Sequence, residues 1–117
     1  MRTLIIITGI FAIFSLGAFA QGKLDSLKIQ TSAQCGMCKD RIEEYLAFEK
    51  GVKRSNLDLN SKIVTVWYKP SRTDQEKIRT AITKIGYDAD DLPADRKAYE
   101  KLPDCCKKPD DPNHKPH

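Results

Sequence analysis

The sequence predicts a ferredoxin-like βαββαβ sandwich, an α+β fold with a four-stranded antiparallel sheet and two helices on one face. Two observations point to this fold. Stretches with strand or helix spacing follow one another in the order strand, helix, strand, strand, helix, strand. The composition, with 40% hydrophobic and 31% charged residues among 117, is that of an ordinary globular domain. The formal net charge of +4 is too small to indicate a nucleic-acid partner.

The first three elements lie in the first half of the chain. Residues 25–31 alternate apolar and polar side chains, which is typical of a strand with one buried face. In residues 38–48, Ile42 and Leu46 are four residues apart and therefore lie on one face of a predicted helix. Residues 52–59 alternate again and predict the second strand.

The last three elements follow a short polar turn. Residues 63–69 are rich in β-branched and aromatic side chains and predict the third strand. A Thr-x-x-Glu pattern from Thr73 to Glu76 predicts a capping box at the start of the second helix, and Gly86 predicts its end. Residues 87–91 predict a short fourth strand that completes the sheet.

The chain is predicted to have three parts. Residues 1–20 combine a basic residue, a long uncharged apolar run and an Ala-Phe-Ala end, which predicts a secretory signal peptide cleaved after Ala20. An uncleaved membrane anchor is the alternative. Residues 21–92 form the domain, and residues 93–117 a short helix followed by a flexible tail that contains cysteine and histidine. We therefore expect a periplasmic or secreted mature protein without a membrane-spanning segment.

The four cysteines are grouped in two local pairs, Cys35 with Cys38 and Cys105 with Cys106. Such spacing is more typical of redox or soft-metal chemistry than of disulfides that join distant strands. The C-x-x-C motif lies just before the first predicted helix, where backbone N–H groups and the basic Lys39 favour thiolates. Two thiolates can hold a soft ion such as Cu(I), Hg(II), Zn(II) or Cd(II), and two suffice for near-linear Cu(I) or Hg(II).

Further motifs accompany the C-x-x-C pair in a fixed order: Ile42-Glu43 and Leu46, then Gly51-Val52, Val64-Thr65-Val66 and Gly86-Tyr87-Asp88-Ala89. Over about residues 24–92 this pattern resembles the heavy-metal-associated domain. That family includes copper chaperones, the N-terminal domains of metal-pumping P-type ATPases and the periplasmic mercury-binding protein. The resemblance implies the same βαββαβ fold.

The resemblance also implies roles for individual residues. Cys35 and Cys38 correspond to the metal-binding cysteines, and Tyr87 to a tyrosine that lies behind the sulfurs without binding the ion. A protein of this kind is not an enzyme. It holds a soft ion, Cu(I) in the first place and Hg(II) next, and passes it to a metal transporter, an efflux component or another metal-binding domain. A metal-bridged dimer is compatible with an exposed two-thiolate site.

The second pair, Cys105 and Cys106, lies outside the part that resembles the family. These thiols are candidates for additional ligands, which either cap the first site or form a second one. The tail residues His114 and His117 are more typical of solvated residues than of ligands, although His-rich tails can collect metal. The alternative is that they form disulfides or lie idle on a mobile tail. The sequence leaves these possibilities open.

The main alternative function is that of a thiol–disulfide redox protein using the same C-x-x-C motif. The segment from Cys35 to Lys39 differs by one residue from the thioredoxin motif. However, the chain between the predicted leader and Cys35 has room for only one strand, and Gln34 rather than Trp precedes the first cysteine. A purely structural domain with disulfides is a third possibility, but it does not explain why both pairs are local. We therefore favour metal binding.

Overall fold

The computed structural model describes residues 23–115, so the predicted signal peptide lies outside the described residues. Strands β1 (Asp25–Gln30), β2 (Val52–Asp58) and β3 (Ile63–Tyr68) form one antiparallel sheet in the order β1-β3-β2. Each strand lies where the sequence predicts it. Between residues 23 and 115, no helix has the length and apolar character needed to span a membrane.

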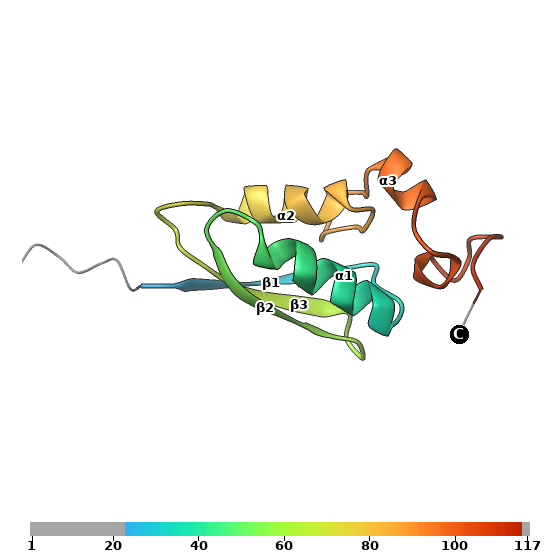
Figure 1. Cartoon of the computed structure of the whole chain (residues 1–117), viewed down its shortest axis with the longest axis horizontal. Coiled ribbons are helices and arrows are strands. Elements are labelled where there is room, and N and C mark those ends of the chain that lie inside the picture. Colours follow the sequence, from blue (N-terminus) through green and yellow to red (C-terminus); the bar gives the residue numbers. More distant parts are fainter. Residues whose placement is uncertain (1–22, 116–117) are drawn as a thin grey trace, which may run out of the picture.

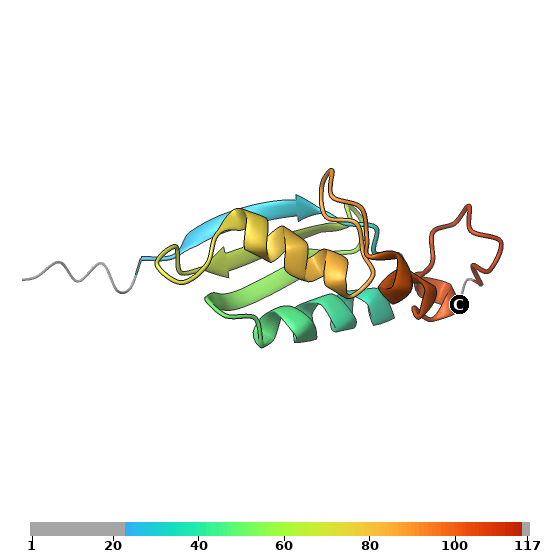
Figure 2. The ribbon, with the colours of Figure 1, turned by 90° about the horizontal axis from the view of Figure 1, so that it is seen from above.

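Two helices cover one face of this sheet (Figure 1 and Figure 2). Helix α1 (Gly36–Ala47) begins two residues earlier than predicted, with Cys35 as its N-cap. Helix α2 (Gln75–Lys84) is capped by Asp74, whose carboxylate accepts a hydrogen bond from the Lys77 N–H at 2.8 Å. The predicted capping box at Thr73 is therefore wrong by one residue, because the carboxylate of the next residue takes the cap position.

The predicted fourth strand is not formed in the described part of the chain. Within residues 87–91, Ala89 makes one antiparallel bridge to Thr31, just beyond the end of β1. The chain then reverses, because Asp90 has a φ of 52° and the backbones of Ala89 and Leu92 bond to each other. The sheet has three strands, and the segment that the family pattern predicts as a strand touches the β1 edge at a single point.

The hydrophobic core lies between the sheet and the two helices. The interior is closely packed, and its fully buried aliphatic side chains come from all five elements: Ile29, Ile42, Leu46, Val64, Val66, Ile78 and Ile82, with Leu57 nearly so. Leu102, Cys105 and Cys106 belong to the same buried cluster. The C-terminal tail therefore contributes to the core at one end of the domain.

The tail runs from the end of α2 to the thiol-bearing end of the molecule. The helix predicted near residue 93 is present as α3 (Arg96–Glu100), and a 3₁₀ turn, η2 (Asp104–Cys106), follows it. After η2, hydrogen-bonded turns extend to residue 115, for example from the Asp111 N–H to the Lys108 carbonyl at 2.9 Å. This segment, predicted as flexible, is folded back on the domain in the structure.

Gly86 allows the tail to pack closely. Its φ of 102° lies in the region that favours glycine, and it ends α2 as the sequence predicts. A Cβ atom at Gly86 would lie only 2.9 Å from the Ala98 carbonyl oxygen of α3. The missing side chain therefore lets the backbone of α3 rest directly on the end of α2.

We predict that Gly86→Ala destabilises the domain, because the alanine must adopt an unfavourable φ and also displace α3. The expected loss in the free energy of unfolding is about 2 kcal/mol, measured by urea denaturation. Gly36→Ala is the matched control, since a Cβ atom there meets nothing within 4 Å. Equal stabilities of the two variants would contradict the close packing of α3 on Gly86.

Candidate metal centre

The C-x-x-C motif is held at the N-terminus of α1. Cys35 is extended, with a φ of −150°, and its carbonyl accepts the Lys39 N–H at 3.1 Å as the first bond of the helix. Cys38 lies in the first helical turn and is fully buried, whereas Cys35 is partly exposed. Their Sγ atoms are 3.4 Å apart. The loop and the helix thus turn both thiols toward one point.

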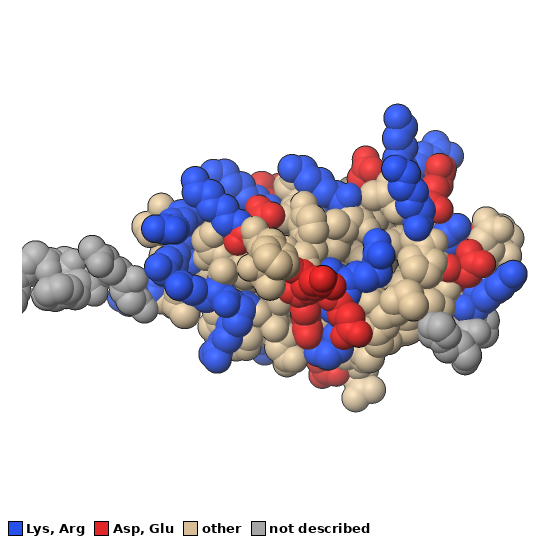
Figure 3. Space-filling view, viewed as in Figure 1, with Lys and Arg blue, Asp and Glu red and all other residues tan. Residues whose placement is uncertain are grey.

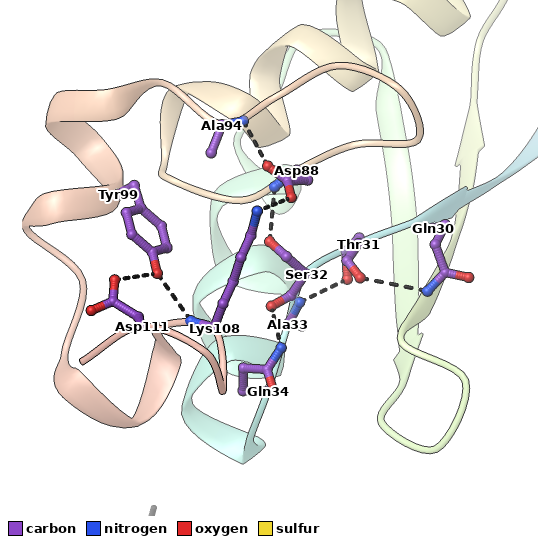
Figure 4. A network of polar contacts seen from close by, with 10 residues as sticks. All are labelled: Gln30, Thr31, Ser32, Ala33, Gln34, Asp88, Ala94, Tyr99, Lys108 and Asp111. Carbon is purple, nitrogen blue, oxygen red and sulfur yellow. Dashed lines mark hydrogen bonds and ion pairs between the residues drawn. The ribbon is translucent and has the colours of Figure 1, made fainter. Parts of the chain in front are cut away.

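The loop before the motif is fixed by hydrogen bonds to neighbouring segments (Figure 4). The Thr31 hydroxyl donates to the Lys62 carbonyl at 2.8 Å and accepts the Ala33 N–H at 3.2 Å. The Ser32 hydroxyl accepts the Asp88 N–H at 2.9 Å. These contacts set the position of the loop relative to the sheet and to the segment after α2, and so they orient Cys35.

The tail brings its two cysteines to the same point. The Cys105 and Cys106 sulfurs lie 3.5 and 3.8 Å from the Cys35 sulfur. The sulfurs of these three residues all lie within 4.8 Å of one another, and all four cysteines are free thiols. Of the arrangements that the sequence leaves open, the structure shows the one in which the tail pair faces the first pair.

Tyr87 closes the buried side of this thiol cluster. Its side chain is completely buried, and its hydroxyl is the only buried side-chain nitrogen or oxygen without a hydrogen-bond partner among residues 23–115. Burial, followed by the neighbouring Cys106 and Cys38 thiols, raises the pKa of Tyr87, so the phenol stays neutral. Tyr87 therefore lies beside the Cys38 and Cys106 thiols.

The thiols differ in acidity. Burial alone would raise the pKa of Cys35, but its hydrogen bonds with the Cys38 backbone N–H and with the thiols of Cys38, Cys105 and Cys106 together lower it. Burial, followed by the contact with Cys35, raises the pKa of Cys105. Burial, followed by the contact with Cys38, raises the pKa of Cys106. Of Cys35, Cys105 and Cys106, Cys35 is therefore the thiol that most readily becomes a thiolate.

Basic side chains occur at both ends of the molecule. Figure 3 shows a group of Lys and Arg at the end of the molecule where β1 begins, and further ones over α3 and the tail. At the end where β1 begins, the repulsion from Lys53, with some burial and the charge of Arg72, lowers the pKa of Lys69. Lys39, expected to add positive charge at the motif, instead pairs with Glu43 at 2.7 Å. The thiolate site is therefore supported by hydrogen bonds more than by a nearby cation.

Asp88 joins the motif loop to the tail, a function that the sequence does not predict. Its carboxylate accepts the Ala94 N–H at 2.8 Å and pairs with the Lys108 ammonium at 2.6 Å, while its own N–H donates to Ser32 (Figure 4). In the sequence Asp88 lies in the predicted fourth strand and Lys108 in a tail predicted as flexible. No local pattern links the two residues.

Tyr99 and His114 make further contacts within the tail. The Tyr99 hydroxyl donates to the Asp111 carboxylate at 2.7 Å and accepts the Lys108 N–H at 3.0 Å. His114 contacts the Lys107 carbonyl through Nδ1 at 2.7 Å, and His117 lies outside the described residues. Among the described residues, the candidate metal-binding cluster is made of cysteine sulfurs and does not include His114.

These features define a class of protein: a ferredoxin-like domain with a C-x-x-C pair at the N-terminus of its first helix. Residues 32–88 match the family model of the heavy-metal-associated domain, so this segment of the chain is a heavy-metal-associated domain. The match confirms the resemblance noted in the sequence. Cys105 and Cys106 lie beyond the matched segment.

Known proteins with similar sequences and structures include copper-related ones. A copper-exporting P-type ATPase of Staphylococcus aureus strain JH9 is 39% identical over 59 residues, which are 50% of this chain and 7% of the ATPase. The chain thus spans only a small part of that relative. A CopZ metallochaperone is 27% identical with a TM-score of 0.53, covering 56% of this chain and 98% of the chaperone.

A third match is the N-terminal domain of a potential copper-translocating P-type ATPase from Bacillus subtilis in the Cu(I)-loaded state. It is 25% identical with a TM-score of 0.55, and the similarity covers 58% of this chain and 86% of that domain. These structural matches support the ferredoxin-like class for the part of the chain that they cover.

We predict that Tyr87→Phe leaves the metal-free domain equally stable or stabilises it by up to about 1 kcal/mol, because it removes a buried hydroxyl without a partner. Tyr99→Phe is the control and is expected to cost about 1 kcal/mol, because it breaks two hydrogen bonds. Both values come from urea denaturation of the reduced protein. A clear loss of stability in Tyr87→Phe would mean that the hydroxyl makes a stabilising bond within the thiol cluster.

Proposed function

We propose that this chain binds a soft metal ion, Cu(I) in the first place, through Cys35 and Cys38, and passes the ion to an acceptor by ligand exchange. The observation that carries the proposal is the pair of thiols 3.4 Å apart at the N-terminus of α1, within a heavy-metal-associated domain. Hg(II) is the next candidate, and Zn(II) and Cd(II) are thiophilic alternatives.

The donor set supports a soft ion. Only sulfur donors meet in the candidate cluster of the described residues, and thiolates select soft ions over Mg²⁺ or Ca²⁺. The relatives whose names mention copper support Cu(I) as the first choice. Cu(I) and Hg(II) accept two thiolates in near-linear geometry, whereas a structural zinc site normally uses four ligands. The burial of Cys38 keeps one ligand away from solvent.

The difference between the two motif cysteines suggests how the ion leaves. Cys35 is partly exposed, so an incoming thiolate from an acceptor can bind the ion beside it. The acceptor thiolate then replaces one ligand at a time, and the displaced thiolate takes up a proton from solvent. A metal transporter, an efflux component or another metal-binding domain with an exposed thiol pair fits this role as the acceptor.

The first prediction of this proposal concerns stoichiometry. The reduced chain should bind one equivalent of Cu(I) in anaerobic titration against a chromophoric chelator. Cys35→Ser/Cys38→Ser should weaken binding by more than about 100-fold, since even a group behind a metal ligand contributes roughly 10- to 100-fold. Ser55→Ala is the control for handling and folding, because Ser55 lies on β2 and is not part of the thiol cluster. Unchanged Cu(I) binding in the double variant would contradict the proposal.

A thiol–disulfide redox function is the second candidate. The lowered pKa of Cys35 and the short distance to the Cys38 sulfur would also suit an attacking and a resolving thiol. The two functions separate in one experiment, in which the reduced chain is offered a model disulfide and Cu(I) in turn. Rapid reduction of the disulfide without stoichiometric Cu(I) binding would mean that the chain is a redox protein and not a metal carrier.

We also propose that the chain works in the periplasm or outside the cell, because of the apolar leader pattern in residues 1–20. The expected result is that the exported protein begins at Gln21, which mass spectrometry of the purified mature form measures. Replacing Ala18 and Ala20 by Leu should block the cleavage, because the peptidase site needs small residues. A protein found in the cytoplasm with residues 1–20 intact would contradict this part of the proposal.

A further inference from the structure

We infer that the C-terminal tail is an internal cap for the C-x-x-C site. In this arrangement the tail cysteines face the Cys35–Cys38 pair and add a third thiolate to it, so the site is closed within one chain, and the Lys108–Asp88 ion pair is the latch that holds the cap. The inference rests on the proposed function, because it concerns the same ion. Beyond the proposed function, the inference says which residues complete the site and that the tail must move before the ion leaves.

The cap is supported first by where the sulfurs lie. Cys35 and Cys105 are 70 residues apart in the chain, yet their sulfurs are 3.5 Å apart, and Cys106 lies 3.8 Å from the same atom. The tail cysteines are only 7% and 1% exposed. Two more thiols are therefore directed at the partly exposed motif cysteine.

A second observation at the same place is the unpartnered Tyr87 hydroxyl. It is fully buried beside Cys38 and Cys106, and it has no hydrogen-bond partner among the described residues. A buried hydroxyl usually has one. Thiolates that carry negative charge on a bound ion are better acceptors than neutral thiols. The phenol would therefore gain its partner when Cys38 or Cys106 binds the ion as a thiolate.

The tail is also fastened in a way that a loose segment would not be. Leu102 is buried in the core, and α3 rests on the backbone of Gly86. Lys108 pairs with Asp88, whose N–H donates to Ser32 in the motif loop. The latch therefore connects the tail to the loop that carries Cys35. The Lys108 side chain is 42% exposed and the Asp88 side chain 28% exposed.

The chemical consequence follows from coordination number. A third thiolate converts a near-linear site into a three-coordinate one and fills the position that an acceptor thiol must occupy. The same sulfurs exclude a second copy of the chain, so a capped site does not form a metal-bridged dimer. Each cysteine that binds does so as a thiolate and releases its proton to solvent, and no electrons are exchanged.

The first test compares the reduced chain with Cys105→Ser/Cys106→Ser, each loaded with one equivalent of Cu(I). X-ray absorption should show three sulfur ligands in the unmodified chain and two, with shorter Cu–S distances, in the variant. The affinity for Cu(I) should fall at least about tenfold. The variant, but not the unmodified chain, should form dimers with Cu(I) in sedimentation experiments. Two sulfur ligands in the unmodified chain would overturn the cap.

The second test opens the latch without touching a thiol. Lys108→Gln should speed the transfer of Cu(I) to an excess of bathocuproine disulfonate by roughly two- to fivefold, as expected for the loss of one partly exposed ion pair. Lys101→Gln is the matched control, because this tail lysine makes no ion pair among residues 23–115. Equal rates for Lys108→Gln and the unmodified chain would overturn the latch.

The cap and the proposed function fail in different ways. If the unmodified chain binds no Cu(I), the proposed function itself is wrong. If Cu(I) binds and is lost in Cys35→Ser/Cys38→Ser, but the tail variants match the unmodified chain in coordination number and transfer rate, only the cap is wrong. Circular dichroism and urea denaturation of each variant confirm that the compared proteins are folded.

Discussion

The packing of the C-terminal tail on one end of the domain is the contact on which the site depends. Leu102, Cys105 and Cys106 fill the end of the core that the strand-helix framework leaves open. Without this burial, Tyr87 and Cys38 would lose their neighbour Cys106, and the Cys35 thiol would meet only its motif partner. Burial of apolar surface is the main stabilising term in a domain of this size. The burial of apolar tail residues therefore both holds the tail in place and determines the surroundings of all four thiols.

The sequence predicted the elements whose signal is local. The three strands, α1 and α2 lie within a few residues of their predicted positions, because alternation and the spacing of Ile42 and Leu46 depend only on neighbouring residues. The fourth strand failed because Asp90 turns the chain with a positive φ, which the residues around it do not signal strongly. The cap of α2 moved from Thr73 to Asp74 because adjacent residues both suit an N-cap.

The candidate site was also predictable only in part, because the sequence displays local signals but not contacts between distant segments. Cys35 and Cys38 form a motif that the local sequence displays, and the resemblance to a family gave Tyr87 its place. The meeting of Cys35 with Cys105 and Cys106 is a contact across some 70 residues, and no periodicity encodes it. The sequence places Asp88 in a predicted strand and Lys108 in a tail predicted as flexible, and no pattern in either segment predicts the ion pair between them.

A carrier has to hold its ion firmly and still release it, and the two tasks can be assigned to different parts of this structure. Thiolates bind soft ions strongly, so a fixed third sulfur would slow release. Besides the burial of Leu102 and the packing of α3 on Gly86, the tail that supplies it is linked to Asp88 by one partly exposed ion pair, a type of contact that contributes about 1 kcal/mol or less. An acceptor that offers a charged group to Asp88 or Lys108 would compete with this pair directly. Contact with such an acceptor would then loosen the cap at the moment when the acceptor thiols are near enough to take the ion.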